Sequence, residues 1–182
     1  KKPNEFRDKF VNGYGLGGIT RGLDIDKPLI AAINGYAVSG GLEIALACDL
    51  RFCSENATFG LQDVKWGFHA CDGALVRLPH IVGMGATMEL VLSGELINAE
   101  HAHKINLVNK IYTNNSLLEK TLEYAHLLAK RAPLAIKFAK QTLRNTVSMP
   151  IEDALKQEVR SFYDLGQSED LAEGTRAFRE RR

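Results

Sequence analysis

The sequence is poor in the features that mark several specialised classes of protein. It contains only three cysteines, Cys48, Cys53 and Cys71, and no C-x-x-C pair. An odd number of scattered cysteines predicts free thiols in a reducing compartment and argues against a disulfide-built secreted domain. No uninterrupted apolar run approaches the ~18 residues that a membrane-spanning helix requires. We therefore expect no membrane partner and a cytoplasmic location, or the mitochondrial matrix if the organism is a eukaryote.

A strong charge imbalance and a metal-binding motif are also absent. The formal net charge is +1 and there is no basic tract, which argues against a nucleic-acid partner. The sequence has no H-E-x-x-H motif, and His101 and His103 would point to different sides of a helix. We therefore predict no metal site. An apolar fraction of 45% and a charged fraction of 25% over 182 residues are typical of a globular protein.

Glycine is plentiful near the start, where "GYGLGG" satisfies the pattern G-x-G-x-x-G at Gly13, Gly15 and Gly18. A dinucleotide-binding fingerprint needs a strand before this pattern and a helix after it. The polar residues 7–12 are a poor buried strand, and "ITRGLD" is a poor helix start. The motif therefore predicts a flexible loop rather than a phosphate cradle.

Short apolar strands alternate with helices over the first two thirds of the chain. Strands are expected over 28–33, 36–38, 49–54, 57–61 and 107–112, and helices over 42–48, within 71–83, and over 85–94, 98–106, 116–131, 134–146, 151–165 and 169–181. Asp72 and Asn98 are the predicted N-caps of two of these helices. The pattern predicts an α/β domain over 1–115 and a helical region over 116–182.

The segment "NGYAVSGGLEIALACDL" places one carboxylate, Glu43, in the first turn of an otherwise apolar helix. The helix dipole alone would favour an acid there. Gly40 and Gly41 immediately precede the expected helix. Unpaired backbone amides at the start of a helix suit an oxyanion. An oxyanion site with a nearby carboxylate suits proton transfer next to a carbonyl. Ser39 lacks the G-x-S-x-G context of a nucleophile and is interpreted as a small turn residue.

A second acid, Asp63, follows in "FGLQDVKWG". Taken alone, it is best interpreted as a solvated loop residue. Two carboxylates in one pocket would repel each other and raise at least one pKa towards neutrality, as general acid–base chemistry needs. Glu43 and Asp63 are therefore a candidate catalytic pair.

Three stretches together identify a resemblance. They are "KPLIAAINGYAVSGGLEIALACDLRFCSENATFGLQDVKWG", "RLPHIVG" and "MELVLSGELINAEHA". They resemble the crotonase family, the enoyl-CoA hydratase/isomerase superfamily, and the likeness runs from about Lys27 to the final "SEDLAEGTRAFRERR". The resemblance implies a crotonase-like ββα spiral core, of which roughly the N-terminal third is missing here. It also implies a helical C-terminal region that builds a homotrimer or a dimer of trimers.

The resemblance further implies a lyase of fatty acid metabolism that adds water across the double bond of a 2-enoyl-CoA thioester. Coenzyme A would enter as part of the substrate, with no other cofactor. By position in the motifs, Gly40 would donate an oxyanion amide, and Glu43 and Asp63 would hold the reacting water. The implied contacts to the acyl-CoA are Ser39, Gly41, Trp66 and Phe178, the last reaching CoA bound to a neighbouring subunit.

Two departures from the family pattern keep alternatives open. Asp63 is one methylene shorter than the usual Glu, and "FHACDGA" replaces the usual Pro and Gly-Gly in the wall of the acyl pocket. An enoyl-CoA isomerase using Glu43 alone, or a dehydratase of a substituted acyl-CoA such as a carnitinyl-CoA-like thioester, would fit the same fold. A non-catalytic binding or RNA-binding member is the alternative of another class. Retention of an acid at both positions argues against it.

Overall fold

The computed structural model describes residues 11–181. The chain divides into two compact units, the first running up to Asp24 and over Leu29–Leu122, the second made of Ile25–Pro28 and the chain from Glu123 onward. The division falls inside helix α5 (Leu117–Ala129). The boundary between 115 and 116 stays a prediction.

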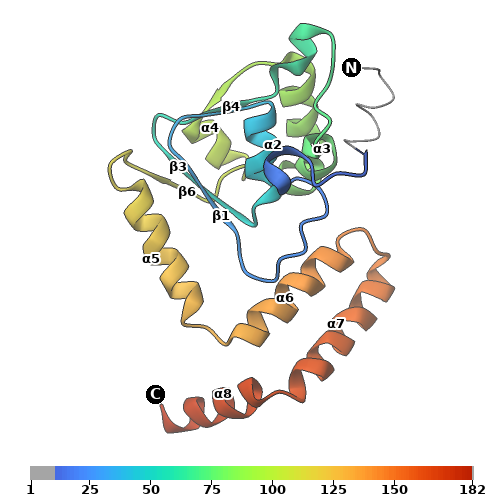
Figure 1. The fold of residues 1–182 in the computed structure, drawn as a ribbon, viewed down its shortest axis with the longest axis vertical. Coiled ribbons are helices and arrows are strands. Elements are labelled where there is room, and N and C mark those ends of the chain that lie inside the picture. The colour runs from blue at the N-terminus through green and yellow to red at the C-terminus, as the bar shows by residue number, and fades with distance from the viewer. Residues whose placement is uncertain (1–10, 182) are drawn as a thin grey trace. The chain divides into compact units, whose positions relative to one another are not determined.

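The first unit is built on two small three-stranded sheets. One contains β1 (Ile30–Ile33), β3 (Leu50–Ser54) and β6 (Lys110–Tyr112), and the other contains β2 (Tyr36–Val38), β4 (Thr58–Gly60) and β5 (Ile97–Asn98). All pairs are parallel except β4 with β5. In Figure 1 the strands occupy one region together with helices α2, α3 and α4.

The chain winds through these sheets as a repeating strand–strand–helix spiral. β1, β2 and α2 (Gly40–Ala47) form one turn; β3, β4, the 3-10 turn η2 (Gln62–Trp66) and α3 (Ala74–Ser93) form the next. The register places Ile30 opposite Leu50 and Tyr36 opposite Thr58, so each strand stacks on its counterpart one turn later. This arrangement confirms the predicted α/β class and the ββα spiral.

The helices of the first unit bury apolar side chains against the strands. Leu42 and Leu46 of α2 and Leu78 and Leu90 of α3 are buried in one core with Phe59 of β4. Full burial of such a side chain contributes roughly 1.5–3 kcal/mol. The apolar run after Gly41 therefore forms a buried helix, as predicted.

Local capping agrees with prediction at one helix and not at the other. At α4 (Ala99–Lys104), Asn98 Oδ1 accepts a hydrogen bond from the His101 amide at 2.9 Å, so this predicted cap is confirmed. At α3 (Ala74–Ser93) the predicted cap is wrong, because Gly73 with φ 113° occupies the cap position instead of Asp72. The Asp72 carboxylate is engaged by other partners, described below.

Helix α3 joins the two helices expected over 71–83 and 85–94. Gly83 (φ 79°, ψ 163°) interrupts its helical geometry, close to the expected boundary. By length and composition alone, α3 could cross a membrane, with a mean hydropathy of 1.3 in its most apolar window. One such helix is weak support for a span, because core helices pass the same test.

The second unit is helical, as expected. It contains the end of α5 followed by α6 (Pro133–Thr146), α7 (Ile151–Gly166) and α8 (Glu169–Glu180). The Thr142 hydroxyl donates to Ser161 Oγ at 2.6 Å between α6 and α7. The Leu134 amide donates to Asp170 Oδ2 at 2.9 Å, which joins α6 to α8.

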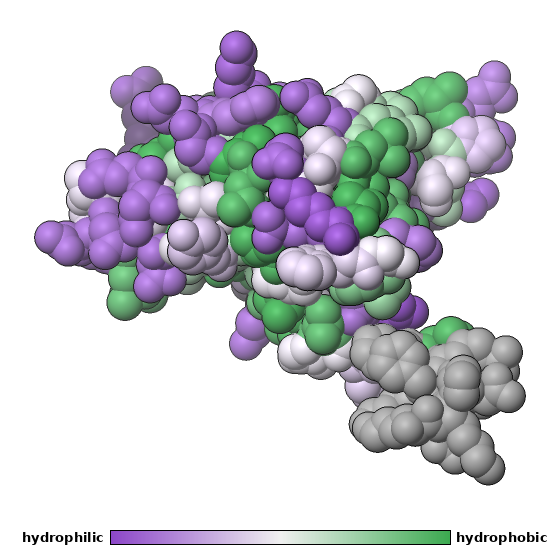
Figure 2. All heavy atoms as spheres, turned by 90° about the horizontal axis from the view of Figure 1, so that it is seen from above, coloured by the Kyte–Doolittle hydropathy of each residue, from purple (hydrophilic) through white to green (hydrophobic). Residues whose placement is uncertain are grey.

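Apolar side chains are also present on the surface. Figure 2 shows one face of the molecule, on which they gather in patches between hydrophilic groups. Within the helical unit, one face of α7 presents a stripe of exposed apolar side chains. Each is between 53% and 72% exposed, and they are Ile151, Leu155, Val159, Phe162 and Tyr163. These positions recur at helical spacing, so they form a continuous face.

Candidate active site

The site is built around the first turn of α2. Ser39 precedes the helix with φ 48°, and its amide donates to the Gly60 carbonyl at 2.8 Å, which ties the turn to β4. The Ser39 side chain makes no capping hydrogen bond, and no described residue accepts one from the Gly40 amide. The first amides of a helix have no intrahelical partner. The Gly40 N–H is therefore available to a developing oxyanion.

Glu43 lies in this turn but is held from outside the helix. It is 3% exposed, and its Oε1 accepts hydrogen bonds from the amides of Asp72 at 2.6 Å and Ala74 at 3.2 Å. Burial raises the pKa of Glu43, the two amide hydrogen bonds oppose this, and the negative charges of Asp72 and Asp63 raise it further. The net pKa lies above the ordinary value, as a general base working near neutral pH requires.

Asp63 is the second acid of the site. It lies in the first turn of η2, is 7% exposed, and acts electrostatically on Glu43. Its Oδ2 is buried and has no hydrogen-bond partner among the described residues. A buried carboxylate oxygen without a partner is costly and calls for a water or ligand as partner.

A cavity of about 440 Å³ lies beside the turn before α3, whose Asp72 amide donates to Glu43. Its lining includes Arg21, His69, Cys71, Asp72 and Arg77. Cys71 is exposed, and burial together with the charges of Glu43 and Asp72 raises the pKa of its thiol. Residues 69–73 of the departing stretch "FHACDGA" therefore line this cavity, whereas Gly40, Glu43 and Asp63 are not among its described lining residues.

The glycine-rich segment packs against the same turn and serves close packing. A side chain at Gly15 (φ 71°) would come within 2.0 Å of Thr20 Oγ1 and 2.7 Å of Asp72 Oδ1. The segment forms a short 3-10 turn, η1 (Leu16–Gly18), and no α-helix follows it directly in the described chain. The dinucleotide fingerprint is therefore not formed here.

A known family matches a chain with this ββα spiral, unpaired glycine amide and pair of buried acids. The model of the family described as "Enoyl-CoA hydratase/isomerase" matches residues 7–182. The chain belongs to the enoyl-CoA hydratase/isomerase family. The resemblance stated from the sequence is thereby confirmed.

Similar individual proteins and solved structures support the same family assignment. It is 38% identical over 172 residues to a carnitinyl-CoA dehydratase of Salmonella typhi, an alignment covering 92% of this chain and 66% of that protein. The chain thus spans slightly less than two thirds of that relative's length. Among solved structures, an enoyl-CoA hydratase of Mycobacterium tuberculosis H37Rv superposes with a TM-score of 0.89 at 35% identity, covering 94% of this chain and 67% of that one. An enoyl-CoA hydratase of Bacillus anthracis superposes with a TM-score of 0.86 at 33% identity, covering 91% of this chain and 63% of that one.

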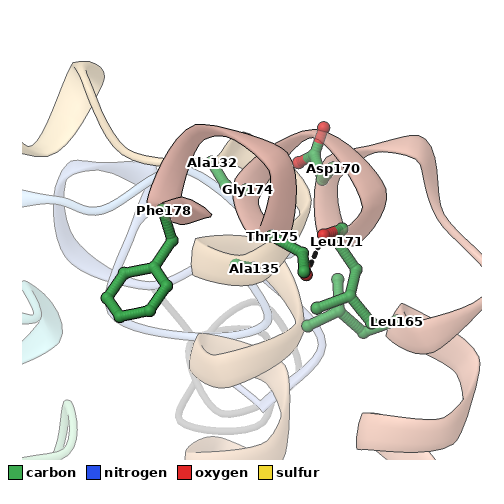
Figure 3. Close-up of a pocket in the computed structure, with 8 residues that line it drawn as sticks. All are labelled: Ala132, Ala135, Leu165, Asp170, Leu171, Gly174, Thr175 and Phe178. Atoms are coloured by element: carbon green, nitrogen blue, oxygen red, sulfur yellow. Dashed lines mark hydrogen bonds between the residues drawn. The ribbon is translucent and has the colours of Figure 1, made fainter. Parts of the chain in front are cut away.

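The remaining predicted contacts occupy different parts of this hydratase/isomerase family member. Gly41 is exposed at the start of α2, and Trp66 is 75% exposed on η2. Phe178 is 85% exposed on α8 of the helical unit. There it lines a cavity of about 390 Å³ with Ala132 and Leu165, and Figure 3 shows its ring at the opposite end from Leu165. The roles of these residues in binding stay predictions.

Asp72 and Arg21 were not predicted to belong to the site. The local pattern predicts a helix cap at Asp72 and a flexible loop just before Arg21. The usable signal was the departure from the family pattern, which introduces a carboxylate where "FHACDGA" replaces a Pro and Gly-Gly stretch.

Proposed function

We propose that the protein is an acyl-CoA lyase of the enoyl-CoA hydratase type, acting on a 2-enoyl-CoA thioester. One observation carries the proposal above the others. Glu43 is buried, and the negative charge of Asp63 contributes to its raised pKa. The buried Oδ2 of Asp63 has no hydrogen-bond partner in the described chain. Such a pair is suited to hold one water between two carboxyl groups.

In the proposed reaction, one carboxylate takes a proton from this water as its oxygen bonds to C3 of the acyl group. The electrons of the double bond move towards the thioester, whose oxygen becomes enolate-like and accepts a hydrogen bond from the Gly40 amide. A carboxylic acid then delivers a proton to C2. Proton transfer of this kind contributes roughly 10²–10⁴-fold to a rate, and an oxyanion donor a further 10²–10³-fold.

Dehydration of a substituted acyl-CoA is the principal alternative within the family. Elimination of water is the reverse of hydration and uses the same two acids and the same oxyanion donor. The 38% identity to proteins named carnitinyl-CoA dehydratase favours this direction. An isomerase would need only Glu43 as a base, leaving Asp63 without a function. A non-catalytic binding role leaves the two buried acids, Glu43 and Asp63, without a function.

Asp63 separates a hydratase from an isomerase that uses one base. We expect Asp63→Asn to slow hydration of crotonyl-CoA at least about 10²-fold, the lower range for a positioned acid or base. Asp63→Glu restores the length usual in the family and should keep much of the activity. The measurement is the hydration rate, together with double-bond shift in a 3-enoyl-CoA, for the full-length protein and both variants.

The two reactions give opposite patterns. An isomerase would shift the double bond at an undiminished rate in Asp63→Asn and lose that rate in Glu43→Gln. Strong isomerisation with negligible hydration in both wild type and Asp63→Asn would contradict the hydratase proposal and leave the family assignment intact.

We also propose that copies of the chain assemble through the helical unit. The stripe on α7 leaves large apolar side chains such as Phe162 exposed, and surfaces of this kind mark association sites. A trimer, or two trimers together, is the assembly expected for this family. A second copy would cover the stripe.

Placing a charge in the α7 stripe should dissociate the assembly. Phe162→Asp would bury an unpaired carboxylate at the contact, which costs several kcal/mol per ion. Light scattering coupled to size-exclusion chromatography should then give the mass of one copy. Arg160→Glu, on the opposite side of α7, should leave the assembly unchanged. An unaltered mass for Phe162→Asp would contradict this use of the stripe.

A further inference from the structure

We propose that Asp72 is a positioning residue that fixes the Glu43 base and the oxyanion donor in one geometry. The inference rests on the proposed function, since it concerns the same site. Asp72 contacts neither the substrate nor the reacting atoms in this proposal. It acts through its backbone on Glu43 and through its side chain on the segment that covers the start of α2.

The backbone of Asp72 is one of two hydrogen-bond donors to the Glu43 carboxylate. Its amide donates to Oε1 at 2.6 Å, and the amide of Ala74 donates to the same oxygen at 3.2 Å. The position of Glu43 therefore depends on the turn before α3. Gly73, with φ 113°, lies between the two donors and allows the turn its left-handed conformation.

The side chain of Asp72 ties this turn to the glycine-rich segment. Oδ1 accepts from Arg21 Nε at 2.7 Å, and Oδ2 accepts from the Leu16 amide at 3.0 Å. Asp72 is only 1% exposed, so both oxygens of a buried carboxylate are satisfied by one charged and one backbone donor. The Arg21 side chain is partly exposed, but loss of Arg21 would leave the buried Asp72 carboxylate without its counter-charge, which is destabilising.

Two arginines bridge the same pair of segments. Arg21 also donates from Nη2 to the Cys71 carbonyl. Arg77 donates from Nη1 to the Asp72 carbonyl at 3.2 Å and from Nη2 to the Thr20 carbonyl at 2.6 Å. Each guanidinium thus joins the 70–73 turn to the 16–21 segment. Planar forked donors of this kind fix geometry more sharply than a single point charge.

The clamped segment lies against the proposed oxyanion donor. A Cβ added at Gly40 would come within 2.9 Å of Leu16 Cδ1, so Leu16 covers the first residue of α2. The Leu16 amide is the same group that Asp72 Oδ2 holds. Asp72 therefore fixes both halves of the machinery, Glu43 through its own amide and the surroundings of Gly40 through Leu16.

Asp72 also acts on Glu43 by its charge. The groups whose charge raises the pKa of Glu43 are Asp72, before α3, and Asp63, on η2; Cys71 and Arg21 are also close by. Burial raises the pKa of Asp72 itself, but its hydrogen bonds with Arg21 and Leu16 and the Arg21 charge outweigh this and lower it. Asp72 thus stays ionised beside Glu43, and its charge adds to the rise in the Glu43 pKa that burial chiefly causes.

The test uses two variants of the full-length protein with opposite effects on charge. Asp72→Asn removes the negative charge, so the pKa of Glu43 should fall and the acid limb of kcat/KM for crotonyl-CoA hydration should move to lower pH. Arg21→Gln leaves the Asp72 charge without its counter-charge, so the acid limb should move to higher pH. Both variants should lose about 10- to 100-fold in kcat at neutral pH, since misplacement by about 1 Å costs on this scale.

A matched control separates positioning from loss of any structural carboxylate. Asp49 also accepts a backbone hydrogen bond, from Leu29 at 2.7 Å, but it follows the C-terminal end of α2, whereas Glu43 lies in the first turn of that helix. Asp49→Asn should change neither kcat nor the acid limb. The proposal would be overturned if the acid limb of kcat/KM stayed unmoved in the Asp72 and Arg21 variants, or moved in the same direction in both.

A second readout keeps this inference separate from the proposed function. The Glu43 carboxyl can be titrated by carbon-13 NMR, with the signal assigned by its loss in Glu43→Gln. If the wild type neither hydrates nor dehydrates acyl-CoA, the proposed function fails, yet the titration still decides the role of Asp72. An unchanged Glu43 titration in Asp72→Asn would overturn the inference whatever the activity.

Discussion

Glu43→Gln should lower kcat by about 10²–10⁴-fold and leave the fold intact, because the variant keeps the shape of the side chain but cannot accept a proton. The amide oxygen of Gln can still accept the hydrogen bonds that Asp72 and Ala74 donate to Glu43 Oε1. The two amides therefore keep a partner, and the position of the side chain is preserved. Steady-state kinetics beside a circular dichroism spectrum provide the measurement.

The stability of this variant gives an independent check. The folded-state pKa of Glu43 is raised, chiefly by burial, so its ionised form is less favourable in the folded protein than in the unfolded chain. By linkage, the stabilisation by Glu43 is full below its unfolded-state pKa and is lost as pH rises through the raised folded-state pKa. At pH 7 to 8, we expect Glu43→Gln to unfold at the same or a higher denaturant concentration than wild type.

The activity should follow the same ionisation in the opposite sense. A base must be ionised to act, so kcat/KM in wild type should fall as pH decreases through the raised pKa of Glu43. A folded Glu43→Gln variant with undiminished turnover would show that Glu43 is only a first-turn acid. A large loss of stability at pH 7 to 8 would point to the same structural role.

Elements with strong local signals were predictable from the sequence. The buried helix α2 follows from an apolar run bounded by Gly40 and Asp49, and the strands β1 and β2 follow from short apolar segments separated by the turn at Asn34 and Gly35. Asn98 caps α4 because the residue three positions on, His101, supplies the amide that it accepts. These features depend on neighbours within a few residues, where sequence patterns are informative.

The arrangement around Asp72 was not predictable in the same way. Its partners Glu43, Arg21 and Leu16 lie 29, 51 and 56 residues away along the chain. A local pattern indicates a helix cap at this position, whereas tertiary contacts supply a stronger set of donors to the carboxylate. The resemblance to the family identified Glu43, Asp63 and Gly40 by position. It gave no information on Asp72, because this residue belongs to a stretch where the chain departs from the family pattern.

Gly40→Pro should impair chemistry far more than substrate binding. Proline has no amide hydrogen, and the loss of one oxyanion donor costs about 2.7–4 kcal/mol in the transition state, or about 10²–10³-fold in kcat. Gly40 is the first residue of α2, a position at which proline is favoured because the missing hydrogen leaves no helix bond unmade. Kinetics with a 2-enoyl-CoA substrate should therefore show a reduced kcat with little change in KM.

Gly40→Ala is the matched control because alanine keeps the amide hydrogen. Of residues 11–181, its Cβ would meet only Leu16 Cδ1 within 4 Å, at 2.9 Å, and the end of a flexible side chain can move. Alanine should therefore lose much less activity than proline. Because Ser39 precedes the substitution with φ 48°, circular dichroism must establish that the proline variant folds. If the folded proline variant keeps its kcat and only its KM rises, the oxyanion donor is not the Gly40 amide. Equal losses for alanine and proline would instead assign the effect to crowding against Leu16.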